Sequence, residues 1–171
     1  MIVNKPERTV LFLLSILAIS ICFSAYGTPQ IPDELTVDGK VVSIHQSPLP
    51  PDVISEINQD HVAQCSANWR GYRAFWTLVD DKLLLDKIEI KPCRNPETIA
   101  ADSVCTDCSY PIESYWYNGV LTYETGEWWG NKVRLNNGGY AIEDYRFEVM
   151  VIEISGGLVT RKYKQVQTYE K

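Results

Sequence analysis

The chain has 171 residues and a mass of 19.5 kDa, a size that fits one domain and excludes a two-domain enzyme. Hydrophobic residues make up 45% and aromatic residues 11% of it, which excludes a disordered chain or a plain coiled coil. The formal net charge of -6 has the wrong sign for a surface that binds phosphates, so nucleic acid is not an expected partner.

Residues 1–27 have the order of a secretory signal peptide. Lys5 and Arg8 precede an apolar run over 10–23, and Ala25 and Gly27 place small residues at the minus-three and minus-one positions of a cleavage site. Cleavage there predicts a periplasmic or secreted protein that has no membrane attachment once the signal is removed.

Two alternatives to cleavage stay open. Retention as a membrane anchor is one, although the apolar run is shorter than the roughly 20 residues that span a bilayer. Lipid modification at Cys22 is the other, although a bulky isoleucine stands where that motif requires a small residue. With residues 1–27 removed, the mature chain has 14 basic and 21 acidic residues and a net charge of -7.

The mature chain begins with a proline-rich segment over 28–52. Prolines lack an amide donor, so most of this segment is expected to stay outside any sheet as an extended leader, with a short strand over 40–44. A single β-rich domain is expected over 53–171. Apolar residues at helical spacing predict a short helix over 52–64.

Alternating side chains predict two hairpins. The first pairs 72–79 with 82–90, and the second pairs 145–154 with 158–166 around the turn Ser155-Gly156-Gly157. Glutamates and basic residues on the second hairpin are expected to pair across the ladder. Further turns are expected at 118–119 and 136–139. The pattern predicts a mainly β fold: an antiparallel curved sheet or a small barrel or sandwich, with at most one short helix.

The mature chain has four cysteines, an even number in a compartment where disulfides persist. Two disulfides are predicted, with at least one that joins Cys93 to Cys105 or Cys108 across the loop 93–111. Cys65 completes the set. The four could instead ligate zinc, although their spacing is not the usual two-knuckle pattern.

Cys105 and Cys108 also have the spacing of a redox-active dithiol, but the strand and helix that surround such a pair in thioredoxin are not expected here. His45 and His61 are the only histidines, which excludes a three-histidine metal site, and neither lies in a catalytic motif. No metal and no cofactor is therefore expected.

Several short motifs together resemble a pattern of small, uncharacterised bacterial proteins. They are WRGY at 69–72, AFW at 74–76, DKLLL at 81–85, WYNGVL at 116–121, GYA at 139–141 and VIEISGG at 151–157. The resemblance implies a bacterial β-rich domain and no established activity. The two cysteines at 105 and 108 are additions to the pattern.

Trp128 and Trp129 are the main candidates for a binding surface. Together with Glu127 and Tyr123 they could stack on a sugar ring and accept hydrogen bonds from its hydroxyls. Adjacent strand residues point to opposite faces, so one of the two tryptophans is expected in the core. A further hypothesis makes Glu124 and Glu127 an acid and base pair for glycoside hydrolysis.

Arg70 is a separate candidate, because it lies between two aromatic residues. It could bind a carboxylate, or it could fix the start of a strand by stacking on a ring. The leading hypothesis for the whole chain is an exported, non-enzymatic protein that binds another macromolecule, with a protein as the first expectation, for example an acidic immunity protein that neutralises a basic toxin. The alternatives are a carbohydrate- or cell-wall-binding protein that uses an exposed tryptophan, and a small hydrolase without a recognisable motif.

Overall fold

The structure is a computed structural model that describes residues 28–60, 65–135 and 140–170. Strands dominate, and this part of the chain has one α-helix, α2 (Pro51–Asp60), which confirms the predicted mainly β fold. In chain order the strands are β1 (Asp33–Val37), β2 (Lys40–Ile44), β3 (Tyr72–Val79), β4 (Lys82–Ile90), β5 (Glu97–Thr98), β6 (Ile112–Glu113), β7 (Gly119–Glu124), β8 (Trp129–Arg134), β9 (Tyr140–Ser155) and β10 (Leu158–Glu170), with a 3-10 helix, η2 (Ala101–Ser103), between β5 and β6.

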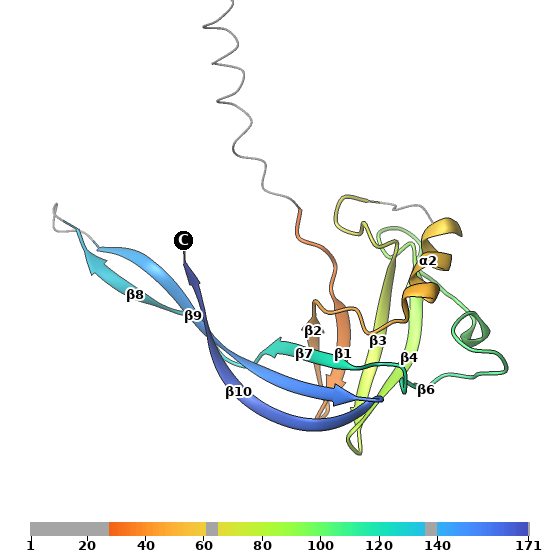
Figure 1. Cartoon of the computed structure of the whole chain (residues 1–171). Helices are drawn as coiled ribbons and strands as arrows, with labels where there is room; N and C mark the ends of the chain where they lie inside the picture. Colours follow the sequence, from red (N-terminus) through yellow and green to blue (C-terminus); the bar gives the residue numbers. More distant parts are fainter. Residues whose placement is uncertain (1–27, 61–64, 136–139, 171) are drawn as a thin grey trace, which may run out of the picture.

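The strands form one open, curved sheet (Figure 1). Its main path runs β2-β1-β3-β4-β10-β9-β7, while β5 and β6 pair with β4, and β8 pairs with β9. These ladders are antiparallel except that of β1 with β3. The sheet is therefore mixed, and of the predicted architectures the curved sheet is the one that forms.

The β3–β4 hairpin follows from the alternation in the sequence. Every second residue of β3 from Tyr72 to Leu78 is buried, and the residues between them are more exposed. Asp80 and Asp81 connect the strands with positive φ, which aspartate tolerates in tight turns. The predicted bounds of both strands are confirmed.

Strands take up ten residues of the proline-rich segment 28–52: five in β2, which was predicted, and five in β1, which was not. Residues 33–37 form β1, which pairs with β2 on one side and with β3 on the other, and Leu35 is fully buried. The reason is the position of the prolines, because Pro32 precedes β1 and Pro48 follows β2. They bracket the two strands and remove no donor from within them.

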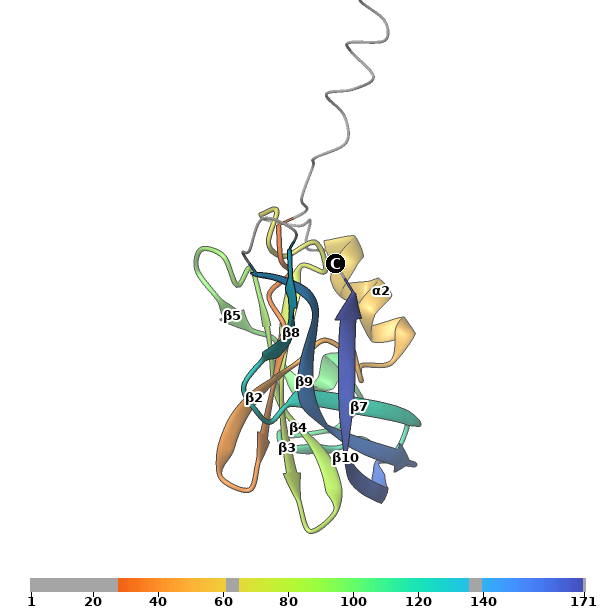
Figure 2. The ribbon, with the colours of Figure 1, turned by 90° about the vertical axis from the view of Figure 1, so that its left-hand side faces the viewer.

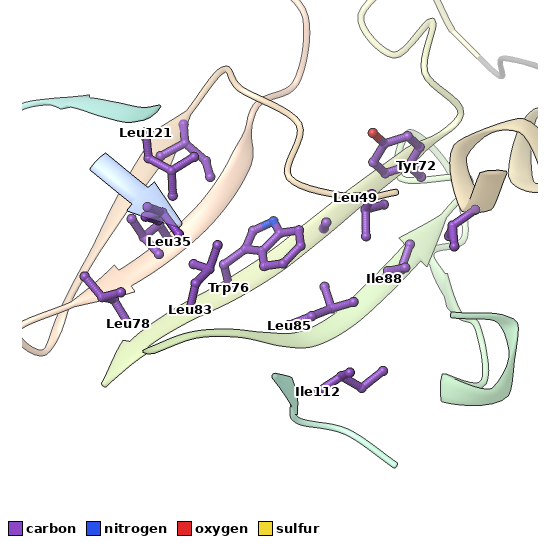
Figure 3. Packing of buried hydrophobic residues seen from close by; sticks show 14 of the residues in the cluster. Leu35, Leu49, Tyr72, Trp76, Leu78, Leu83, Leu85, Ile88, Ile112 and Leu121 are labelled. Carbon is purple, nitrogen blue, oxygen red and sulfur yellow. The ribbon is translucent and has the colours of Figure 1, made fainter. Parts of the chain in front are cut away.

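Inward side chains of the hairpin form the centre of the hydrophobic core. Figure 3 shows Trp76 of β3 with Leu83 of β4 and Leu35 of β1 around it, and all three are buried. The predicted helix is confirmed as α2, which adds Val53 and Ile57, one helical turn apart. Full burial of a side chain of this size contributes about 1.5 to 3 kcal/mol.

The second hairpin is confirmed, but β9 and β10 are longer than predicted. The two strands pair along 144–155 and 158–170, and Gly156 and Gly157 make the turn with positive φ. The expected cross-strand charge pairing is present, since Lys164 Nζ lies 2.8 Å from Glu148 Oε1. The turn expected at 136–139 and residues 61–64 of the expected helix lie outside the described residues.

β9 changes neighbour along its length. Its C-terminal half pairs with β7, and its N-terminal half pairs with β8. We call β8, residues 140–148 of β9 and residues 166–170 of β10 the arm. In Figure 1 the arm extends away from the hairpin of β3 and β4, and in Figure 2 it points toward the viewer.

Candidate binding site

An aromatic cluster lies at the base of the arm. The ring of Trp128 stacks on that of Phe147, with centroids 4.3 Å apart and planes 16° from parallel, and it meets Tyr145 edge-on at 6.3 Å. Trp128 Nε1 donates a hydrogen bond of 2.9 Å to Glu124 Oε2. Trp128 is nevertheless 49% exposed. We call Trp128, Tyr145 and Phe147 the aromatic cluster.

The expectation that one of the two adjacent tryptophans enters the core is wrong. Trp129 is also exposed, at 44%, and in the ladder it stands opposite Arg146, on the face of β9 opposite to Tyr145 and Phe147. The physical reason is that β8 pairs only with β9, in a part of the sheet beyond the core residues. Both faces of the strand therefore leave a tryptophan partly open to solvent.

A cleft of about 550 Å³ adjoins the aromatic cluster. Phe147 belongs to both the aromatic cluster and the lining of the cleft, and Val149 continues this lining along β9. Hydroxyl, amide, carboxylate and imidazole groups share the cleft with apolar side chains. The remaining lining residues are Val41, Val42, Ser43, His45, Thr122, Tyr123, Glu124 and Gln167.

The cleft lies where the curved sheet fails to close. β2 and β7 end the strand order on opposite sides, and no ladder joins them. One side chain bridges the two edges: Gln46 Nε2 donates to Thr122 Oγ1 at 2.7 Å, and the Thr122 amide donates to Gln46 Oε1 at 3.2 Å. The amide of Gln46 thus takes the place that a backbone peptide group would have in a ladder.

The predicted site residues fall into two separate places. Trp128 belongs to the aromatic cluster, Tyr123 lines the cleft, and Glu127 is exposed in the connection between β7 and β8. Burial raises the pKa of Tyr123, so its hydroxyl stays protonated and able to donate at neutral pH. Arg70 makes its contacts elsewhere, with β1 and β3.

Arg70 binds a buried carboxylate within the chain. Its Nη2 donates to Asp33 Oδ1 at 2.9 Å, and its guanidinium lies 5.0 Å from the centroid of the Tyr72 ring. The backbone N–H of Ala74 and Nε1 of Trp76 also donate to Asp33. Burial raises the pKa of Asp33, and the nearby Arg70 cation opposes the rise. These contacts fix Arg70 next to the start of β3, which is the structural role considered for it.

Sequence reasoning missed most residues of the site. They are Tyr145 and Phe147 of the aromatic cluster, and Val41, Val42, Ser43, Thr122, Val149 and Gln167 of the cleft. Tyr145, Phe147 and Val149 alternate along a predicted strand, so a signal that they share one face was available. No local sequence pattern could indicate that these residues lie near Trp128 or near β2. His45 was noted only for its chemistry, and the structure places it in the cleft. His61 lies outside the described residues.

Cys65, Cys93, Cys105 and Cys108 form two disulfides, Cys65–Cys93 and Cys105–Cys108. Two disulfides were predicted, but the predicted bond from Cys93 to Cys105 or Cys108 is wrong. Cys65 precedes β3 and Cys93 follows β4, and because Tyr72 pairs with Ile90 the hairpin brings its two flanks together.

The pair Cys105–Cys108 sits in a tight turn. The amide of Cys108 donates to the carbonyl of Cys105 at 3.3 Å, and Asp107 has a positive φ. The turn follows η2, whereas the cysteines of a thioredoxin-like dithiol begin a helix. In the described ranges 28–60, 65–135 and 140–170, no group of three or more potential metal ligands comes together.

No family model, no curated protein and no solved structure matches this chain. A search for membrane-spanning helices, limited to the described residues, finds none of sufficient length and hydrophobicity.

Proposed function

We propose that this protein is an exported binding protein that recognises another protein through the aromatic cluster and the adjoining cleft. The observation that carries the proposal is the half-exposed Trp128, stacked on Phe147 at the edge of a cleft of about 550 Å³. Binding energy at protein interfaces concentrates in a few tryptophan, tyrosine and arginine residues. Ring stacking and the bond to Glu124 hold Trp128 in place, so little side-chain entropy is lost on binding.

Charge and export define the kind of partner. The mature chain would carry a net charge of -7, which speeds association with a basic protein. Export is supported by the order of charged, apolar and small residues in 1–27 and by the two disulfides, which persist in oxidising compartments. An immunity protein that neutralises a basic toxin is one concrete form of this proposal. The proposed function is binding alone, without a catalysed reaction.

A second candidate function is carbohydrate binding. It is favoured by the side chains of the cleft, where Thr122, Glu124 and Gln167 offer hydrogen bonds beside the ring of Phe147. Sugars are bound by this combination of aromatic surface and planar polar groups. Glu127, exposed next to Trp128, would extend such a site.

The test begins with the mature chain as bait in an extract of the producing cell's envelope. A captured protein is identified, purified and titrated calorimetrically with the wild type and with Trp128→Ala. We expect Trp128→Ala to weaken binding by about 30-fold or more, the effect of losing a hot-spot residue. Trp69→Ala is the matched control, because Trp69 is 73% exposed but outside the arm, with its amide bonded to Gln30.

Three results would contradict the proposal. Binding that survives Trp128→Ala, or that is lost in Trp69→Ala, would place the interface elsewhere. Retention of the wild type on immobilised polysaccharide, with loss of retention in Trp128→Ala, would favour the carbohydrate function.

A further inference from the structure

β10 has a long edge that no described strand covers. It pairs with β9 over its whole length, but with β4 at one position only, Leu158 opposite Lys82. The ammonium of Lys162 still lies 3.2 Å from Asp81 of the β3–β4 turn, and residues 166–170 of β10 form one margin of the arm beside β9 (Figure 2). Along 162–170 one row of backbone donors and acceptors is thus open to a further strand, as at any sheet edge.

This edge lacks the protection that exposed strands usually have. Lysines commonly block edge pairing, but Lys162 and Lys164 are bonded to Asp81 and Glu148 of the same chain. The stretch 165–169 carries no charged residue and exposes the side chains of Val166 (52%) and Tyr169 (61%). An uncharged, partly apolar edge of this kind favours strand addition.

We propose that a second copy of this chain pairs with this edge, as an antiparallel strand with Val166 on the twofold axis. Val166 is the midpoint of 162–170, so this register gives the longest ladder. In this register all the paired residues except Lys164 and Thr168 are of the same type. The register places Val166 opposite its own copy, Gln165 opposite Gln167, Lys164 opposite Thr168, and Tyr163 opposite Tyr169.

Neither the lysines along the edge nor the symmetry opposes this pairing. The two copies of Lys164 lie four residues apart along the ladder, about 13 Å, which exceeds the Debye length of about 8 Å at physiological salt. A twofold axis perpendicular to the sheet keeps each face continuous from one copy to the next. The two arms therefore form one six-stranded sheet, with both aromatic clusters on the same face. The inference does not depend on the proposed function.

Single cysteines test the register, because the four mature cysteines are already in disulfides. In Val166→Cys the two new thiols face each other across the axis, at the Cβ separation of about 4.5 to 5.5 Å of paired strand residues. We expect copper phenanthroline to oxidise them to a covalent dimer on a non-reducing gel. Thr168→Cys is the matched control, because residue 168 faces residue 164, and we expect it to stay a single chain. Equal cross-linking of both variants, or none of either, would overturn the proposed register.

Sedimentation tests the dimer itself. We expect the mature wild type to sediment as a dimer and Val166→Lys as a monomer, because two ammonium groups would then meet at the axis. Val41→Lys, at a valine of β2 that is 63% exposed, should remain a dimer. Circular dichroism establishes that each variant is folded. A monomeric wild type, or a folded Val166→Lys that sediments as a dimer, would overturn the proposal.

Discussion

Asp33 shows how a charged residue is held in the interior of this sheet. Its carboxylate is inaccessible to solvent and accepts hydrogen bonds from the Arg70 guanidinium, the Ala74 amide and the Trp76 indole. A buried carboxylate is tolerated only when it is paired and hydrogen-bonded. Because these donors stand on or just before β3, Asp33 ties the start of β1 to that strand.

Replacing Arg70 by Met should therefore destabilise the protein strongly. The change leaves the buried carboxylate without its counter-ion, which costs about 3 to 5 kcal/mol of unfolding free energy. Urea unfolding at neutral pH measures the loss. Arg73→Met is the control, since its pair with Glu34 is partly exposed on both sides and should contribute about 1 kcal/mol or less. Equal losses in the two variants would contradict the role assigned to Arg70.

The raised pKa of Asp33 predicts a pH dependence of stability. The folded protein binds the Asp33 proton at a higher pH than the unfolded chain does, where the ordinary value is 3.8. The contribution of this group to stability therefore falls as the pH rises from 3.8 through the folded-state pKa. We expect the unfolding free energy of the wild type, minus that of Asp33→Asn, to decrease over this window. An increase would contradict the stated direction.

Two features of the structure require a glycine at position 157: its backbone conformation and the close approach of the Ser114 backbone. Its φ is +76°, and an added Cβ would lie 2.7 Å from the carbonyl oxygen of Ser114. Gly39 has a similar φ of +72° with open space around it. We expect Gly39→Ala to cost about 1 to 2 kcal/mol for the left-handed conformation. Gly157→Ala should cost about 1 to 3 kcal/mol more than Gly39→Ala, because the added Cβ also clashes with Ser114. The urea unfolding midpoints of the two variants measure this difference. Similar midpoints for the two variants would contradict this prediction and show that the backbone at Ser114 moves to accommodate the added Cβ.

At the scale of elements, the β3–β4 hairpin organises one disulfide. It brings Cys65 and Cys93 together although they are 28 residues apart, while Cys105 and Cys108 are separated by only 3. The predicted short loop across 93–111 does not form, because the β3–β4 hairpin joins the segments on either side of it.

The two disulfides should differ in their contribution to stability. In the chain-entropy model, closing a loop of this length contributes about 3 to 4 kcal/mol for Cys65–Cys93 and about 1 to 2 kcal/mol for Cys105–Cys108. Double Cys→Ser variants of each pair, compared by urea unfolding, measure the difference. A larger loss for the 105–108 pair would contradict this ordering.

Across the whole molecule, the hydrophobic core and the arm have separate tasks. Trp76 is buried at the centre of the core, whereas Trp128 lies just before β8 at the base of the arm, with half of its surface exposed. The sheet can carry such an arm because β9 pairs with β7 along one half and with β8 along the other. Stability should therefore depend on the first tryptophan and recognition on the second.

Thermal melts of single variants test this separation. Trp76→Ala should lose about 3 to 5 kcal/mol, the cost of emptying a buried aromatic site. Trp128→Ala should lose about 1 kcal/mol, the order of an aromatic pair beyond its buried area. A loss in Trp128→Ala as large as in Trp76→Ala would show that the arm is part of the cooperative core.

Local signals in the sequence, namely alternation, turn residues and helical spacing, were enough to predict the strands 72–79 and 82–90, the glycine turn at 156–157 and a helix where α2 forms. They also indicated Trp128 and Tyr123 of the candidate site. Three features become visible only in the folded chain: β1 enters the sheet parallel to β3, Cys65 pairs with Cys93, and Phe147 contacts both Trp128 and the cleft beside β2. These contacts join residues far apart in the chain. Which residues meet depends on how the whole sheet folds, and no local sequence pattern specifies this.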